Sequence, residues 1–140
     1  MTFELFLNFN DGKARAAADF YAGVFHSSVE NVMLFGDAPA DPKYPIKESE
    51  RGRLMYASVK IADKKIMFMD MSSDFPAKTG DNITPVISVA DHAEIDRLAR
   101  ELGDGGATIM SPQKTFFSQY YAMVSDKFGI TWHILTPEAA

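Results

Sequence analysis

The sequence predicts an α+β fold made of two consecutive βαβββ modules. The first observation is an order of segments, one strand, one helix and three strands, that occurs twice along the chain. The second is a similar tight turn before the last strand of each module, Ala62-Asp63-Lys64 and Asp126-Lys127-Phe128-Gly129. The third is that one proline-rich insertion, residues 36–52, accounts for the greater length of the first module. We therefore expect a single domain over residues 1–140, with modules at 1–72 and 81–137.

The first module begins with residues 3–10, where side chains alternate with the period of two that is typical of a strand. Leu5, Leu7 and Phe9 share one side of this strand. Asn10-Asp11-Gly12 interrupts the pattern and offers a cap for a helix. An alanine-rich segment with apolar residues at helical spacing follows, so we expect a helix over residues 13–25.

Three strands and a long loop are expected in the rest of the first module. Residues 29–35 have the pattern of a strand. Residues 36–52 contain three prolines and seven charged residues, which indicates an irregular loop, and its charged run 48–51 is expected to be solvated. Residues 54–61 and 66–71 are expected to pair as a hairpin.

The second module repeats the same order. Residues 82–89 alternate, with Ile83, Ile87 and Val89 on one face, which predicts a strand. Asp91 is expected to cap the following helix by accepting from its first amides, while Glu94 favours the positive helix end. The glycines of residues 103–106 end that helix. Three more strands are expected at residues 107–110, 120–125 and 130–136.

The composition narrows the classes of function. An apolar fraction of 46%, with 12% aromatic residues, is enough for a packed core. A formal charge of −5 without a basic cluster argues against a nucleic-acid partner. The absence of cysteine excludes disulfides, thiolate nucleophiles and cysteine zinc sites. No apolar stretch approaches the roughly 20 residues of a membrane-spanning helix, and no leader pattern is present, so we expect a cytoplasmic protein without a membrane partner.

Several short motifs extend over nearly the whole chain. They are Phe9-Asn10-Asp11-Gly12, Asp19-Phe20-Tyr21, Leu34-Phe35-Gly36-Asp37-Ala38-Pro39, Pro112-Gln113-Lys114-Thr115-Phe116-Phe117 and Met123-Val124-Ser125-Asp126-Lys127-Phe128-Gly129-Ile130-Thr131-Trp132. In this order the chain resembles the PhnB-like family of the glyoxalase, bleomycin resistance protein and dioxygenase (vicinal oxygen chelate) superfamily. The resemblance implies curved mixed sheets that enclose a cleft, and a homodimer. Some relatives carry a methyltransferase description, but the sequence has no glycine-rich nucleotide loop after a strand, so we do not expect methyl transfer.

Metal-using members of that superfamily place His, Glu or Gln at one position on the first and last strand of each module, where a divalent ion polarises the substrate. By resemblance, these positions are Glu4, Met67, Thr84 and His133. The apolar side chains of the same strands lie on the opposite face, which supports this assignment. Met67 and Thr84 are poor ligands for such ions. Asp70 is three positions from Met67, hence on the other face of a regular strand. We expect no cofactor; a divalent cation held by Glu4 and His133 alone would bind weakly.

His133 is the first candidate for a functional side chain, and Glu4 is the second. A cleft imidazole can bind an anionic or carbonyl ligand, or act as an acid or base near neutral pH. The alternative for His133 is a purely structural hydrogen bond to Glu4 or to a strand neighbour. The alternative for Glu4 is an exposed carboxylate at a strand edge.

Ten residues are expected to line the ligand site of the cleft: Phe6, Asn8, Met67, Met69, Thr84, Gln113, Phe116, Phe117, Tyr120 and His133. Methionine thioethers adapt to irregular apolar ligands, although a methionine stripe can equally be core or dimer packing. The aromatic residues between 116 and 121 either line the pocket or anchor a loop at its rim. Trp132 is assigned to the core by alternation.

Three functions remain open at this point. The leading one is a small-molecule-binding protein without a complete catalytic metal site. The second is a lyase, isomerase or dioxygenase-type enzyme that depends on His133 or on a metal. The third is a structural or regulatory dimer whose cleft is filled by its own side chains. The sequence does not decide whether the protein is an enzyme.

Overall fold

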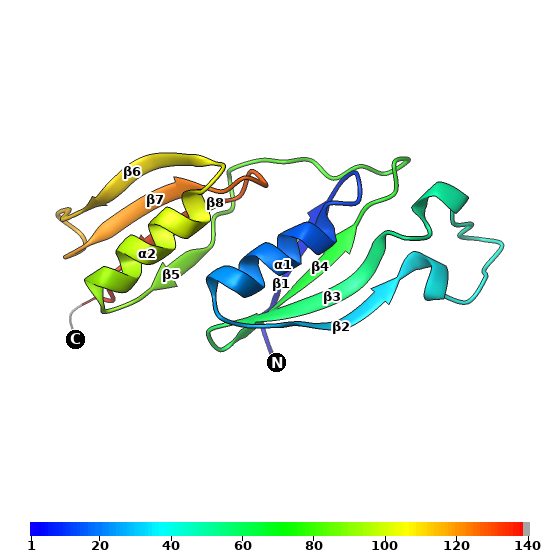
Figure 1. Ribbon diagram of the computed structural model, residues 1–140, viewed down its shortest axis with the longest axis horizontal. Helices are drawn as coiled ribbons and strands as arrows, with labels where there is room; N and C mark the ends of the chain where they lie inside the picture. The colour runs from blue at the N-terminus through cyan, green and yellow to red at the C-terminus, as the bar shows by residue number, and fades with distance from the viewer. Residues whose placement is uncertain (139–140) are drawn as a thin grey trace. The chain divides into compact units, whose positions relative to one another are not determined.

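The computed structural model describes residues 1–138. Its contacts divide the chain into two compact units, Met1–Lys78 (unit 1) and Thr79–Ala140 (unit 2), and each unit is described by itself. Each contains one α-helix and one four-stranded mixed sheet, in the order βαβββ (Figure 1). The α+β class and the doubled element order are therefore confirmed. The expected modules, 1–72 and 81–137, fall one within each unit.

Unit 1 contains β1 (Leu5–Phe9), α1 (Ala14–Val24), β2 (Val29–Leu34), β3 (Leu54–Ile61) and β4 (Lys64–Asp70). The strands are ordered β1-β4-β3-β2; β1 and β4 are parallel, and the other neighbours are antiparallel. The loop after β2 contains two short 3-10 turns, η1 (Phe35–Asp37) and η2 (Glu48–Glu50). The predicted hairpin turn is present, and Ala62 takes a positive φ of 54° in it.

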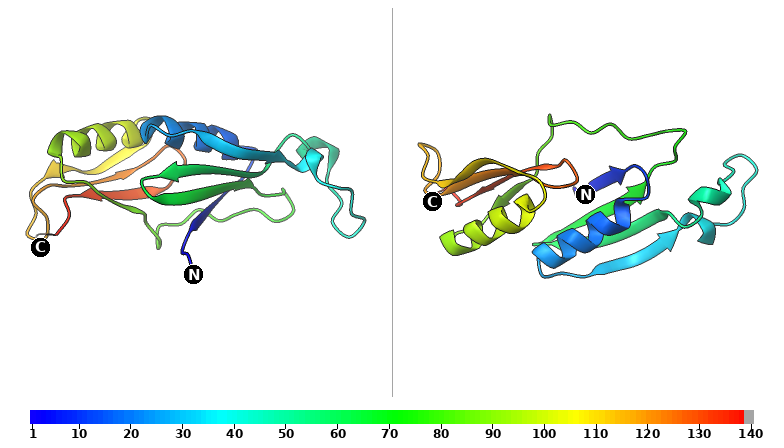
Figure 2. Two further views of the ribbon diagram at one scale, coloured as in Figure 1. Left: turned by 90° about the horizontal axis from the view of Figure 1, so that it is seen from below. Right: turned by 45° about the horizontal axis from the view of Figure 1, so that its top comes forward.

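Helix α1 covers one face of the unit 1 sheet, packing on β3 and β4, and the other face carries no helix of this unit (Figures 1 and 2). The core between α1 and the sheet contains Tyr21, Ala57, Val59 and Phe68, each fully buried. Alternation places Phe6 on the opposite face, where it is 40% exposed. We call that opposite face the open face of unit 1.

Asp70, at the end of β4, holds the start of α1. Its Oδ1 accepts from the Ala14 amide at 2.8 Å, and its Oδ2 accepts from the Leu54 amide at 2.8 Å. The predicted cap at residues 10–12 was wrong, because the N-cap residue is Lys13 and it makes no side-chain hydrogen bond. The acceptor instead comes from 56 residues further along the chain, a distance over which no local pattern operates.

Unit 2 contains β5 (Val86–Ser88), α2 (His92–Gly103), β6 (Ala107–Gln113), β7 (Tyr121–Ser125) and β8 (Thr131–Leu135). The strands are ordered β5-β8-β7-β6, with β5 and β8 parallel. Asp91 caps α2 by accepting from the Ala93 amide at 3.0 Å, as expected. Helix α2 covers one face of this sheet, and we call the opposite face the open face of unit 2 (Figure 2).

The core of unit 2 contains apolar side chains of α2, β7 and β8: Ile95, Leu98, Leu102, Val124, Trp132 and Ile134. Trp132 is 3% exposed, which confirms its assignment to the core. Its indole nitrogen donates to Asp126 Oδ2 at 2.8 Å, while Oδ1 of the same carboxylate accepts from the amides of Phe128 and Ile130. The buried Asp126 therefore fixes the turn between β7 and β8 from within.

The strand expected over residues 82–89 is limited to β5, which has three residues. Ile83 lies outside the sheet and is 75% exposed, so its expected place on the core face was wrong. Pro85 is the physical reason, because proline has no amide hydrogen to donate to a sheet and restricts the residue before it. Pairing with β8 begins only at the Pro85 carbonyl, which accepts from the His133 amide at 3.0 Å.

Candidate functional site

The open face of unit 1 joins side chains of β1, β3 and β4. Phe6 is paired in register with Met67, and Asn8 with Met69, so these four candidate residues lie side by side on two neighbouring strands. Tyr56 adds an aromatic ring, edge-on to Phe6 at a centroid distance of 6.2 Å. The result is a mostly apolar surface with two thioethers and one amide, of the kind that accommodates irregular apolar ligands.

Glu4 precedes β1 and lies at the margin of this surface. Its Oε2 is 3.4 Å from the ammonium of Lys65, and both side chains are partly exposed. This ion pair compensates the charge of the carboxylate within unit 1. An exposed pair of this kind contributes little to stability, on the order of 0–1 kcal/mol.

The open face of unit 2 is organised around His133 on β8. Its register partners are Met123 on β7 and Val86 on β5. The hydroxyl of Tyr121 lies 2.6 Å from Nδ1 of His133, and Tyr121 is only 6% exposed. Burial raises the pKa of the Tyr121 phenol above its usual value of 10. The phenol therefore stays protonated at neutral pH and is available as a hydrogen-bond donor.

A row of rings continues from this pair toward solvent. The centroid distances are 5.8 Å from His133 to Tyr121, 5.0 Å from Tyr121 to Phe117, and 5.2 Å from Phe117 to Phe116. Phe117 is 53% exposed and Phe116 is fully exposed. Ser118, which is 8% exposed, fixes the turn that carries them through its hydroxyl contact with Thr136 at 2.9 Å. Large apolar rings thus project from an anchored turn next to a polar pair.

The ten expected lining residues include Tyr120 but not Tyr121, which the sequence analysis gave only among the aromatic residues that line the pocket or anchor a loop at its rim. The structure turns Tyr120 toward α2, where it stacks on His92 at 4.4 Å and its hydroxyl donates to Asp96 Oδ1 at 2.6 Å. Alternation along β7 was the available signal, because Tyr121 and Met123 share a face and Met123 pairs with His133. Tyr120 does not belong to the open face.

Two further candidates make no hydrogen bond or ring contact with His133 within the described residues. Thr84 precedes β5 and lies outside the sheet. Gln113 is the last residue of β6, and its amide donates to the Ser111 carbonyl at 3.1 Å. The structure therefore groups His133, Phe117 and Phe116 with Tyr121, and leaves Thr84 and Gln113 apart from this group.

The four positions that the resemblance implies for a metal do not offer a fitting donor set. Glu4 is paired with Lys65, and Met67 is a thioether. Thr84 lies outside the sheet, and Nδ1 of His133 is engaged by Tyr121. Within residues 1–138 no three His, Asp or Glu side chains are grouped so that they could hold a metal ion. Asp70 faces α1, as its spacing from Met67 predicted.

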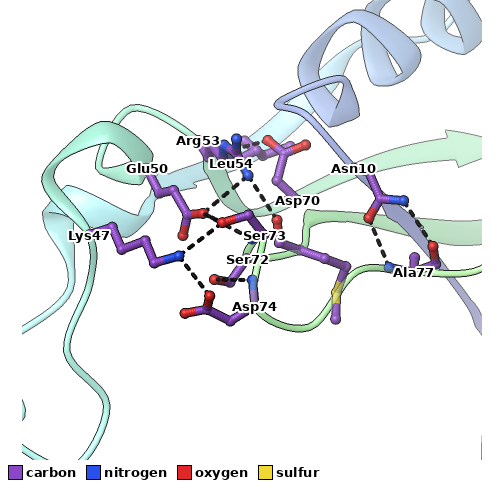
Figure 3. A network of polar contacts seen from close by, with 11 residues as sticks. Asn10, Lys47, Glu50, Arg53, Leu54, Asp70, Ser72, Ser73, Asp74 and Ala77 are labelled. Atoms are coloured by element: carbon purple, nitrogen blue, oxygen red, sulfur yellow. Dashed lines mark hydrogen bonds and ion pairs between the residues drawn. The ribbon is translucent and has the colours of Figure 1, made fainter.

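Glu50 is the residue for which the sequence reasoning was most clearly wrong. The charged run 48–51 was expected to be solvated, yet Glu50 is only 6% exposed. Its Oε1 accepts from the amide and the hydroxyl of Ser73, both at 2.9 Å, and from Arg53 Nη1 at 3.5 Å (Figure 3). The hydrogen bonds from Ser73 lower the pKa of Glu50 from 4.5 to about 2. The carboxylate is therefore charged at all ordinary pH values.

Other contacts of this network fix the segment after β4. Lys47 donates to Asp74 Oδ1 at 2.7 Å and to the Ser73 hydroxyl at 3.0 Å. Asn10 makes a reciprocal pair with Ala77, since its amide donates to the Ala77 carbonyl and its oxygen accepts from the Ala77 amide, each at 2.8 Å (Figure 3). The loop after β2 and the segment after β4 are thereby joined within unit 1.

Comparison with solved structures shows which proteins share this architecture. A protein of Pseudomonas aeruginosa matches with 24% identity and a TM-score of 0.86, covering 99% of each chain. A PhnB protein of Bacillus cereus, described as a 3-demethylubiquinone-9 3-methyltransferase, matches with 23% identity and a TM-score of 0.75, over 98% of this chain and 100% of its own. A glyoxalase/bleomycin resistance protein/dioxygenase family enzyme of Burkholderia phytofirmans matches with 16% identity and a TM-score of 0.62, over 94% and 95%. These similarities establish the shared fold.

Sequence comparison gives the family. No curated protein matches the chain significantly. The helices within residues 1–138 are all too short or too polar to cross a membrane. The family model described as 3-demethylubiquinone-9 3-methyltransferase matches residues 2–135, which is nearly the whole chain. The chain therefore belongs to this PhnB-like family, and its fold is that of the glyoxalase, bleomycin resistance protein and dioxygenase superfamily.

Proposed function

We propose that the protein binds a small organic molecule on the open face of unit 2, with His133 as the polar anchor and without a resident catalytic metal. The observation that carries this proposal is the Tyr121–His133 hydrogen bond of 2.6 Å beside the exposed rings of Phe117 and Phe116. A few placed polar groups among apolar and aromatic side chains are typical of small-molecule sites.

The hydrogen bond assigns a role to each nitrogen of His133. In this proposal the protonated phenol of Tyr121 donates to Nδ1, and the ring proton of the neutral imidazole then resides on Nε2. Nε2–H is then a donor for an acceptor group of the ligand, such as a carbonyl or carboxylate oxygen. Phe117 and Met123 contribute apolar contact area beside it.

The open face of unit 1 supports the same kind of function. Phe6, Tyr56, Met67 and Met69 offer apolar area of high adaptability, and Asn8 offers both a donor and an acceptor. The family description names methyl transfer, but the chain has no glycine-rich loop between a strand and a helix that would hold a nucleotide-type methyl donor. We therefore propose binding rather than methyl transfer. A homodimer and a cytoplasmic location stay predictions.

The test uses protein labelled with ¹³C at the methionine methyl groups, with benzoate and acetophenone as probes. We expect both probes to shift the Met123 methyl resonance in the wild type, and to lose this effect in His133→Ala. His92→Ala is the matched control, because His92 is exposed and stacks on Tyr120 rather than facing Tyr121. Shifts that persist in His133→Ala, or a Met123 signal that neither probe moves, would contradict the proposal and favour a structural role.

A second candidate function is proton transfer at a carbonyl substrate, in a lyase or isomerase. A phenol hydrogen-bonded to an imidazole is an arrangement that can orient a general acid or base. The test is hydrogen–deuterium exchange of dihydroxyacetone in D₂O, followed by proton NMR. Exchange above background that disappears in His133→Ala supports an enzyme; equal rates with and without the protein argue against it.

A further inference from the structure

Unit 1 contains a pocket that is separate from the residues assigned to the open faces. It has a volume of about 560 Å³, within the range of small-molecule sites. Its walls come from the loop after β2, from Met55 on β3 and from the segment after β4. Most lining side chains are apolar, including Phe35, Tyr44, Ile46 and Phe75.

The walls of this pocket are held in place by the buried Glu50 network. Glu50 lines the pocket and accepts two hydrogen bonds from Ser73, which lies between the lining residues Ser72 and Asp74 (Figure 3). Arg53 Nη1 donates to the Met71 carbonyl at 3.1 Å, at the start of the same segment. A site whose walls are already fixed loses less conformational entropy when it binds a ligand. The pocket is therefore preorganised.

The charges around the pocket balance. Its lining carboxylates are Asp41, Glu50 and Asp74. Asp74 is paired with Lys47 at 2.7 Å, and Glu50 with Arg53 at 3.5 Å. Asp41 accepts from the amide of Lys43, whose ammonium-bearing side chain also lines the pocket. Two carboxylates are thus ion-paired, and the third, Asp41, shares the lining with the opposite formal charge of Lys43. A charged ligand would give up its hydration without meeting an unbalanced opposite charge.

The rings at the mouth of the pocket are incompletely covered. Tyr44 is 76% exposed and Phe75 is 74% exposed. Among the ring contacts of residues 1–138, none involves Phe35, Tyr44 or Phe75. A planar ligand can stack on such rings, and its burial would remove their apolar surface from water.

From the balanced charge, the unpaired rings and the fixed walls, we infer that this pocket is a second small-molecule site, and that its ligand is an uncharged molecule with an aromatic ring system. This site lies wholly within unit 1, in residues 35–75. It is independent of the binding proposed at His133. The sequence motif Leu34-Phe35-Gly36-Asp37-Ala38-Pro39 and the insertion after it supply much of its wall.

Two fluorescent probes that differ by one sulfonate group test the inference. N-phenyl-1-naphthylamine is uncharged, and 8-anilino-1-naphthalenesulfonate is its anionic counterpart. We expect the dissociation constant of the uncharged probe to be at least about tenfold lower than that of the anionic probe. The reason is that the sulfonate charge of the anionic probe would offset the apolar contacts that this probe makes. In ¹³C-methyl methionine spectra the uncharged probe should shift the methyl resonance of Met55. The methyl resonances of Met67, Met69 and Met123 should not change.

Two variants assign the site. Phe75→Ala removes an exposed ring and leaves the core intact, and it should weaken the uncharged probe about tenfold. Phe3→Ala, the matched control, removes an 85% exposed ring of unit 1 that does not line the pocket, and it should leave that affinity unchanged. The inference would be overturned by any of three results. These are a shift of the Met123 resonance without a shift of the Met55 resonance, equal affinities for the two probes, or an unchanged affinity in Phe75→Ala. Because benzoate binding at Met123 is measured separately, failure here and failure of the function proposed for His133 can be told apart.

Discussion

The carboxylate of Glu50 accepts both the backbone amide and the side-chain hydroxyl of Ser73, which lies 23 residues further along the chain. One oxygen thereby joins the loop after β2 to the segment after β4. The same two segments form the walls of the unit 1 pocket. The charge state of Glu50 is thus connected to the shape of that pocket.

The first prediction concerns the pH dependence that Glu50 gives to stability. The pKa of Glu50 is about 2 in the folded protein, whereas an unperturbed glutamate has a pKa of 4.5. The folded state therefore favours the charged form of the carboxyl group. The stabilisation is fully present above pH 4.5, and it is lost as the pH falls from there toward 2. In thermal unfolding at pH 7, Glu50→Gln should therefore have a lower Tm than the wild type. This difference in Tm should narrow as the pH falls below 4.5.

Glu48→Gln is the control for this experiment, because the Glu48 side chain is 95% exposed. It should follow the wild type at every pH. A gap between Glu50→Gln and the wild type that stays constant down to pH 3 would show that the carboxylate charge is not what stabilises this contact.

The fold could be predicted because its signals are local and repeated. Alternation along β1 and β4 and the helical stripe in residues 13–25 each depend on near neighbours in sequence, and the repeat supplied a second copy of each pattern. The wrong cap of α1 and the unexpected burial of Glu50 share one cause. Asp70 caps α1 and Glu50 binds Ser73 over long sequence separations, and a single sequence gives no signal for such pairs.

The candidate site was predicted in part for the same reason. Phe6, Asn8, Met67 and Met69 follow from alternation alone, and the structure places them together. Tyr120 and Tyr121 were both considered as pocket lining, and only Tyr121 lies beside His133, because Tyr120 stacks on His92. A shift of one position moves a side chain to the other face of a strand.

The second prediction concerns Asp70, which is 1% exposed. Asp70→Ala leaves the buried amides of Ala14 and Leu54 without an acceptor, and it should destabilise the protein by about 2–5 kcal/mol. Urea unfolding followed by circular dichroism measures this loss. The exposed Asp81→Ala should stay within about 0.5 kcal/mol of the wild type. Equal stabilities of the two variants would refute the capping role.

The third prediction concerns the ring nitrogens of His133. If Tyr121 donates to Nδ1, long-range ¹H–¹⁵N spectra at pH 8 should show one tautomer, with the proton on Nε2. Tyr121→Phe should give a mixture of tautomers and cost about 1 kcal/mol of stability. Tyr120→Phe, which loses only the hydroxyl bound to Asp96, should keep the single tautomer. A proton on Nδ1 in the wild type would reverse the donor assignment.

The fourth prediction concerns metal content. Glu4 is paired with Lys65, and Met67 offers only a thioether. Nδ1 of His133 is engaged by Tyr121. We therefore expect any divalent ion to bind weakly. Elemental analysis after exposure to nickel, zinc, manganese and iron salts and gel filtration should find well under one ion per chain. The double variant Glu4→Ala, His133→Ala should give the same values as the wild type. Stoichiometric metal in the wild type that disappears in the double variant would show that these two side chains form a metal site, and would favour a metal-dependent enzyme over the binding protein proposed here.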